Sequence, residues 1–134
     1  MKFIAKNRVR MHDTDMAGIL YFPRQFRFIH DAWEDLMEEE GFDFHTLIFH
    51  ENYLFVVAHA EADYLAPLKV GDDLVVKVTC EKLGTTSFTM SYEIEKRDGL
   101  VVGRGKTVHV TLQADTRTKI PIPAALRLKL EKYQ

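Results

Sequence analysis

The segment from Pro23 to about Glu40 has the spacing of one long amphipathic helix, and this feature most restricts how the chain can fold. Pro23 suits the first position of a helix, and Gly41 suits its C-terminal end. Arg27 and Asp31 are four residues apart on the polar face, so they can form an ion pair. A helix with one apolar face must pack against another layer of structure. The apolar residues recur at intervals of three and four: Phe22, Phe26, Ile29, Trp33, Leu36 and Met37.

Most of the remaining chain has the alternation of β-strands. An Asp98-Gly99 pair favours a hairpin between the last two of them. One long helix followed by an antiparallel meander predicts a single α+β domain, residues 1–134, in which the sheet wraps around the helix. Strands are expected over residues 3–12, 54–65, 74–83, 86–96 and 100–114, a loop or short helix over 42–52, and a short helix over 124–132.

The strand expected over residues 54–65 has two different faces. Leu54, Val56, Ala58, Ala60, Ala62 and Tyr64 fall on one face by alternation. Three small alanines on that face would leave room for the helix, with Phe26 and Trp33, to lie close to the sheet. The other face carries Phe55, Val57 and Leu65 together with polar residues. A sheet with apolar residues on its second face often completes itself in an oligomer.

Composition excludes several classes of protein. A chain of 134 residues with a formal net charge of -2 has room for one core and no basic character for nucleic acid or a membrane surface. The single cysteine, Cys80, cannot form an internal disulfide and is expected to be a small buried hydrophobe. His45 and His50 have no partners with metal-ligand spacing, so no metal is expected. The first residues lack the apolar core of a signal peptide, and a cytoplasmic location is expected.

The candidate site is a short acidic loop that leads directly into the helix. Asp13 and Asp15 precede Gly18, and Pro23 begins the helix, all within eleven residues. A carboxylate is thereby held near a helix start, where backbone N–H groups are free and the dipole is positive. A base or nucleophile beside such an anion-binding end is a catalytic arrangement. The competing interpretation makes Asp15 a cap of the helix. For Asp13, capping or stiffening of the loop is favoured over chemistry.

These residues also resemble a known active-site signature. The pattern Arg8-Val9, Thr14-Asp15, Gly18-Ile19 and Phe22 is similar to that of the hotdog-fold thioesterases of the 4-hydroxybenzoyl-CoA type. Leu20 stands where that family usually has valine, which is a conservative change. The resemblance extends from about residue 4 to about residue 118 and includes Ala62–Pro67 with Gly71-Asp72, and Lys82–Gly84 with Ser87-Phe88.

The resemblance implies an enzyme that hydrolyses acyl-CoA thioesters without a metal or other cofactor. It implies a hotdog dimer, commonly paired into a tetramer, with the pocket built between subunits. Asp15 would be the catalytic carboxylate, as nucleophile or as general base on water. The backbone N–H of Phe22 would polarise the thioester carbonyl, and Gly18 would let the loop approach it. A thioester has a good leaving group, so an oriented carboxylate and one amide can supply much of the catalysis.

The aromatic residues near the helix start favour an aryl acyl group slightly over a short or medium aliphatic one. Tyr21, Phe22 and Trp33 could contact such a group, although any core helix would bury residues of this kind. His30 lies on the apolar stripe, where a lone histidine is usually a satisfied core group. However, His30-Asp31-Ala32-Trp33 resembles a run in the dihydroxynaphthoyl-CoA branch of the family, which gives His30 equal claim to a role in binding an aryl hydroxyl.

Candidates for the rest of the substrate lie on the strands. His59 and Glu61 face away from the helix and could line a surface between subunits. Lys82 is a candidate for the CoA phosphates, as are Arg104 and Lys106.

Two other functions remain open: a non-catalytic acyl-CoA binder, and a dehydratase of the same fold. A dehydratase would use a histidine and an acidic residue on the helix, for which His30 and Glu34 are present. Otherwise Glu34 either orients His30 or is simply solvated, and solvation is favoured.

Overall fold

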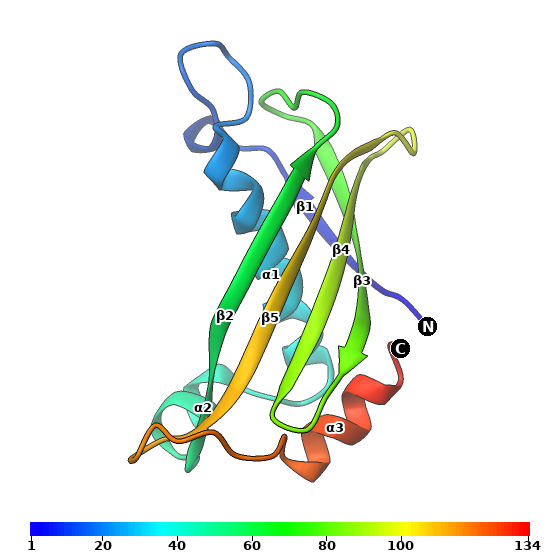
Figure 1. The fold of residues 1–134 in the computed structure, drawn as a ribbon. Helices are drawn as coiled ribbons and strands as arrows, with labels where there is room; N and C mark the ends of the chain where they lie inside the picture. Colours follow the sequence, from blue (N-terminus) through cyan, green and yellow to red (C-terminus); the bar gives the residue numbers. More distant parts are fainter.

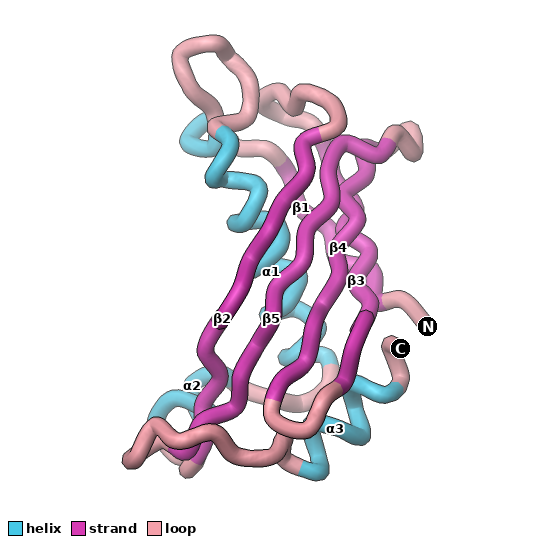
Figure 2. Tube along the Cα trace, in the orientation of Figure 1, coloured by secondary structure: helices cyan, strands magenta, loops and turns pink.

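A computed structural model of residues 1–134 shows a five-stranded antiparallel sheet with one long helix lying across one face (Figures 1 and 2). The strands are ordered β1-β3-β4-β5-β2, so β1 and β2 form the two edges. This arrangement confirms the expected α+β fold. The elements are β1 (Phe3–Arg8), α1 (Gln25–Glu39), α2 (Phe44–Phe49), β2 (Tyr53–Tyr64), β3 (Asp73–Leu83), β4 (Ser87–Lys96), β5 (Val101–Gln113), α3 (Ala124–Glu131) and two short 3-10 helices, η1 (Met11–Asp13) and η2 (Phe22–Arg24).

The first strand is shorter than the alternation of residues 3–12 predicts. It ends at Arg8, and the chain then turns into η1. The Asp13 carboxylate accepts the N–H of Arg10 at 2.8 Å, which curls the chain away from the sheet. The alternation of residues does not show that the Asp13 side chain takes the backbone N–H of Arg10, in competition with a continued strand.

Helix α1 is built as its spacing predicts, and it begins through η2. Pro23 lies in the first turn of η2, and α1 continues from Gln25. Gly41 has φ +90°, and the N–H groups of Gly41 and Phe42 bond back to the carbonyls of Glu38 and Met37. This left-handed termination is easily adopted by glycine. The buried face packs against the sheet through Phe28, Ile29, Ala32, Trp33, Leu36 and Met37.

Two glycines, not the alanines, allow the helix to approach the sheet. A Cβ atom at Gly103 would lie 2.6 Å from Gln25 Oε1, and one at Gly105 would collide with the buried Ile29. Ala58 and Ala60 on β2 are exposed. The expectation that β2 alanines make room for α1 is therefore wrong for Ala58 and Ala60, whereas Ala62 is half-buried and pairs with Gly105. A glycine pair inside a strand was the signal for a close backbone approach.

A bulge in β2 inverts the predicted faces of its first half. The register with β5 shifts between Val57 and His59. Phe55 consequently faces the helix, where its ring centroid lies 6.4 Å from that of Trp33, so its predicted outward position is wrong. One extra residue exchanges the two sides of a strand. Beyond the bulge the prediction holds, since Glu61 pairs with Lys106 on the outer face.

His109 is a buried polar residue that sequence reasoning did not single out. Its ring stacks on Phe88 with centroids 5.0 Å apart, and its centroid lies 4.5 Å from that of Trp33. Its Nε2 atom lies 2.8 Å from Thr107 Oγ1, which is also 2.8 Å from the Tyr92 hydroxyl. Burial, with a smaller contribution from the charge of His30, lowers the pKa of His109 to about 4.

Stability is therefore expected to fall on mild acidification. The pKa of His109 is lower in the folded chain than its ordinary value of 6.5, so between pH 6.5 and about 4 the unfolded chain binds the extra proton. Its contribution is complete above pH 6.5 and is lost as the pH falls through this range. Urea unfolding at pH 7 and pH 5 should differ by about 2 kcal/mol. The same difference in a His109→Phe variant would show that another group is responsible.

One further sequence expectation concerns Cys80. Cys80 is 2% exposed and burial raises its thiol pKa to about 11, which confirms it as an inert buried residue. Helices long and apolar enough to cross a bilayer do not occur in the chain.

Candidate active site

The acidic loop is a closed hairpin-like turn between η1 and η2, at one end of the molecule (Figure 1). Its stem is the pairing of Thr14 with Leu20, next to which Asp15 N–H donates to the Ile19 carbonyl at 3.0 Å. The Gly18 N–H donates to the Asp15 carbonyl, also at 3.0 Å. Gly18 has φ +78°, so glycine is the residue that closes this turn without strain. The chain therefore returns sharply from Asp15 to the helix start.

The Asp15 carboxylate lies exposed in this loop. Its Oδ1 atom accepts the N–H of Ala17 at 2.8 Å, and its Oδ2 atom accepts no hydrogen bond from the chain. The bond is made inside the loop, so Asp15 does not cap the helix. The Ala17 bond orients the carboxylate while one oxygen stays free to take a proton or to attack a carbonyl.

The amide of Phe22 is the free donor at the helix start. Pro23 has no N–H, and the Arg24 N–H donates to the Tyr21 carbonyl at 2.8 Å. The Phe22 N–H has no acceptor in the chain. The Phe22 carbonyl is held by the Tyr64 hydroxyl at 2.7 Å. This peptide is therefore fixed, with a donor directed out of the first turn, as an anion-binding site requires.

An apolar cavity of about 390 Å³ lies beside Phe22 and the Ile19–Leu20 side of the loop. The Ile19 side of the loop pairs with Lys69, and Leu20 N–H donates to the Leu68 carbonyl at 2.9 Å, which ties the loop to the segment after β2. Sequence reasoning assigned no site role to this segment, although its first residues belong to the Ala62–Pro67 run. The cavity can take the apolar part of a substrate. Its walls are Ile19, Leu20, Phe22, Tyr64, Leu65, Ala66, Pro67 and Leu68.

The structure places the other predicted substrate contacts on or near α1 in three different environments. Tyr21 is 48% exposed beside the Phe22 ring and is not one of the residues that line the cavity. Trp33 is 3% exposed, and within this chain its ring packs in the core against Phe55 and Phe88 instead of lining the cavity. His30 does not lie on the buried stripe. Its side chain is 61% exposed, with Nδ1 3.2 Å from Glu34 Oε1.

His59 and Lys82 do not converge with Asp15 within one chain. His59 lies in the middle of β2 on the outer face, with Nε2 3.7 Å from Glu61 Oε1. Lys82 is exposed near the end of β3 and pairs with Thr89, far from the acidic loop (Figure 1). Arg104 and Lys106 lie in ion pairs with carboxylates on the outer face. The chain also brings no three metal-ligating side chains together.

Asp13 has the structural role that the sequence favours. Its side chain is completely buried, and Arg27 donates to both carboxylate oxygens at 2.7 and 2.5 Å. Burial would raise the pKa of Asp13, but the hydrogen bonds from Arg27 and Arg10 outweigh it and hold the pKa below its usual value. Arg27 also pairs with Asp31 at 3.0 Å, as predicted for residues one helical turn apart.

Known proteins are similar to this chain in sequence and in fold. Residues 9–130 match the pattern of the thioesterase-like superfamily. A 1,4-dihydroxy-2-naphthoyl-CoA hydrolase from Nostoc punctiforme is 32% identical over 92% of this chain and 82% of its own length. A 1,4-dihydroxy-2-naphthoyl-CoA thioesterase from Synechocystis superposes with a TM-score of 0.91 at 27% identity, covering 97% and 96% of the two chains. A gentisyl-coenzyme A thioesterase superposes with a TM-score of 0.84 at 26% identity, covering 96% and 99%.

Proposed function

Because this chain belongs to the thioesterase-like superfamily and has its hotdog fold, we propose that it hydrolyses an aryl-CoA thioester to the free acid and CoA. The observation that carries the proposal is the exposed Asp15 carboxylate, held in a closed loop that leads directly to the free amide of Phe22. Phe22 lines an apolar cavity that can take an acyl group. The attack on the thioester carbon and the charge that develops on its oxygen therefore each have a suitable group.

The Phe22 amide acts on the carbonyl oxygen. When a nucleophile adds to the thioester carbon, negative charge develops on that oxygen, and a fixed N–H stabilises it without reorganisation. Asp15 acts on the other side, as base or as nucleophile. As base it takes a proton from the attacking water. As nucleophile it forms an anhydride that water then cleaves. In both routes collapse of the tetrahedral species expels the CoA thiolate, which then takes up a proton.

The aryl preference rests on the relatives and on the cavity. The Nostoc protein is named for a dihydroxynaphthoyl ester and one structural neighbour for a gentisyl ester, and both are hydroxylated aromatic acids. Phe22 and Tyr64 supply aromatic walls, with ring centroids 6.4 Å apart. A panel of CoA esters tests the preference: kcat/KM should be highest for the hydroxyaryl esters, and faster hydrolysis of short or medium aliphatic esters would contradict it.

His30 is proposed to recognise a ring hydroxyl, supported by its exposed imidazole and its contact with Glu34. His30→Ala should lower kcat/KM for a hydroxyaryl ester about tenfold to a hundredfold more than for an aliphatic ester, because one substrate hydrogen bond is lost. Since His30 is exposed, the melting temperature should hardly change. Equal losses on the two esters would exclude this role.

A dimer or tetramer is proposed on the basis of the β2 edge. This strand is twelve residues long, has β5 on one side only, and exposes Val56, Val57 and Ala60. Long apolar edges usually find a partner. A second copy could also bring its His59 and Lys82 toward the Asp15 loop, which neither residue reaches within one chain. Sedimentation should show at least a dimer at micromolar concentration, and a stable monomer would contradict this assembly.

A further inference from the structure

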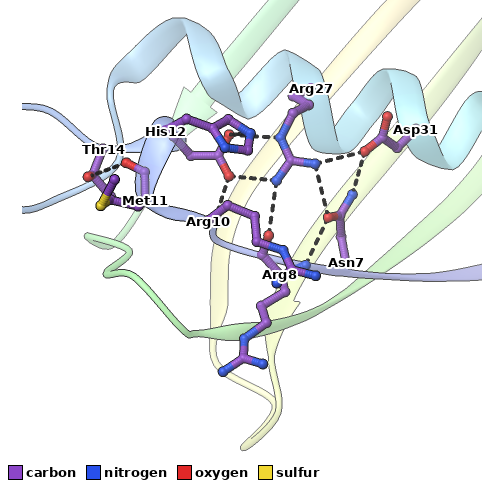
Figure 3. Close-up of polar contacts among 9 residues, drawn as sticks. Asn7, Arg8, Arg10, Met11, His12, Thr14, Arg27 and Asp31 are labelled. Carbon is purple, nitrogen blue, oxygen red and sulfur yellow. Dashed lines mark hydrogen bonds and ion pairs between the residues drawn. The ribbon is translucent and has the colours of Figure 1, made fainter.

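We propose that Arg27 and Asp13 form a clamp that positions Asp15 relative to the Phe22 amide, although neither residue contacts the cavity. Arg27 extends from α1 across the start of the acidic loop, toward Asn7 and Arg8 (Figure 3). The inference rests on the proposed function, because it assigns to this pair the geometry that the proposed chemistry requires. It names two positioning residues, one on each side of the loop.

The guanidinium of Arg27 has no spare donor. Its Nε and Nη2 atoms each donate to the Asp13 carboxylate, at 2.7 and 2.5 Å. Nη2 also donates to the Arg8 carbonyl at 3.0 Å. Nη1 donates to Asp31 at 3.0 Å and to Asn7 at 3.3 Å. These five bonds match the five N–H groups of an arginine, so the side chain is held in one orientation.

Asp13 is held as firmly as Arg27. Its carboxylate is 0% exposed and accepts from Arg10 N–H in addition to Arg27. A buried charge with a bidentate partner has one favourable geometry, and loss of the partner is costly. The clamp therefore joins three elements at one point: β1 through Asn7 and Arg8, η1 through Asp13, and α1 through Arg27.

The backbone of Asp13 transmits this position to both catalytic groups. The Asp13 carbonyl accepts the N–H of Tyr21 at 2.7 Å, and this bond closes the base of the loop. Asp15 is two residues after Asp13, and the Phe22 amide directly follows Tyr21. A shift of Asp13 therefore changes the separation of the carboxylate and the amide. Since such groups act through alignment, a small displacement has a large effect on rate.

The cavity itself is held by other contacts. Leu20 is bonded to the Leu68 carbonyl, and Tyr64 is bonded to Phe22. Substrate binding should therefore survive a change in the clamp better than catalysis does. This separates a positioning role from general damage, which would affect binding and turnover together.

The test is the steady-state kinetics of Arg27→Lys, well below its melting temperature. Lysine keeps the charge but cannot bind Asp13 through two parallel N–H groups. We expect kcat to fall about tenfold to a hundredfold while KM changes by less than about threefold. Hydrogen exchange at the Tyr21 amide should also accelerate. Asp13→Asn, which keeps the shape and removes the buried charge, should give the same pattern and replaces Arg27→Lys if that variant does not fold.

Glu40→Gln is the matched control. Glu40 is also a nearly buried carboxylate at 5% side-chain exposure, bonded to Lys132 at 2.8 Å and to the Tyr133 hydroxyl, at the opposite end of α1. It should lose stability but keep kcat. If Arg27→Lys and Asp13→Asn both keep kcat as Glu40→Gln does, the clamp has no positioning role. The proposed function would fail in a different way, through an unmodified chain that releases no CoA.

Discussion

Asp15→Asn should reduce turnover of an aryl-CoA ester by about a hundredfold to ten-thousandfold, the range that a positioned base supplies. Asparagine keeps the shape and the Oδ1 acceptor that bonds Ala17 N–H, so the loop should stay closed. It cannot take a proton from water or attack the thioester carbon. The ester should still bind, because the cavity walls are unchanged. Single-turnover rates and ester affinity measured on the same preparation test both parts.

Asp98→Asn is the matched control for this substitution. Asp98 is also an exposed aspartate in a tight turn, and its Oδ1 atom accepts Leu100 N–H at 2.9 Å. It should retain the turnover of the unmodified chain. Retention of near-normal turnover by pure Asp15→Asn as well would remove Asp15 from the mechanism.

Phe22→Pro should lower kcat by about a hundredfold to a thousandfold, because it deletes the one free amide at the helix start. Proline suits this position, since Tyr21 before it has φ -70° and ψ 119°, an extended conformation that proline prefers in its neighbour. The position is also the first residue of a short helix, where no intrahelical donor is lost.

Phe22→Ala separates the amide from the side chain. It removes the ring that walls the cavity but keeps the N–H, so KM should rise while kcat falls much less than in Phe22→Pro. Equal kcat values for the two variants would show that the amide does not stabilise the transition state. Circular dichroism should confirm that both variants keep the fold.

Features with a local cause could be predicted from the sequence. The helix start beside Pro23, its end at Gly41 and the hairpin at Gly99 depend on residues within a few positions, and the structure confirms all three. The Arg27–Asp31 pair followed from one turn of helix. The bulge in β2 could not be predicted in this way, because one extra residue leaves the alternation readable in two registers.

The position of His30 on α1 also could not be predicted from the spacing of residues alone. Ile29 packs onto Gly105, and the next residue is rotated by about 100° around the axis, which carries His30 off the covered face. A stripe drawn from spacing alone is wider than the surface that the sheet covers.

The candidate site was predicted in part. The loop between Asp15 and Phe22 is contiguous, so its pattern is visible in the sequence. Its wall at Tyr64 and Leu68 lies more than forty residues away, and the bonds that join them depend on the folded sheet. The Arg27–Asp13 pair likewise joins two elements fourteen residues apart. Only the fold brings such residues together.

The central claim is that this chain breaks a thioester by adding water. The most direct measurement is the product of the unmodified chain with 1,4-dihydroxy-2-naphthoyl-CoA, followed by thiol titration and mass spectrometry. We expect one free CoA thiol and one free acid for each ester consumed. An ester that stays intact would indicate a binding protein, and a product that keeps CoA and gains a double bond would indicate a dehydratase. Either result would contradict the proposed hydrolysis.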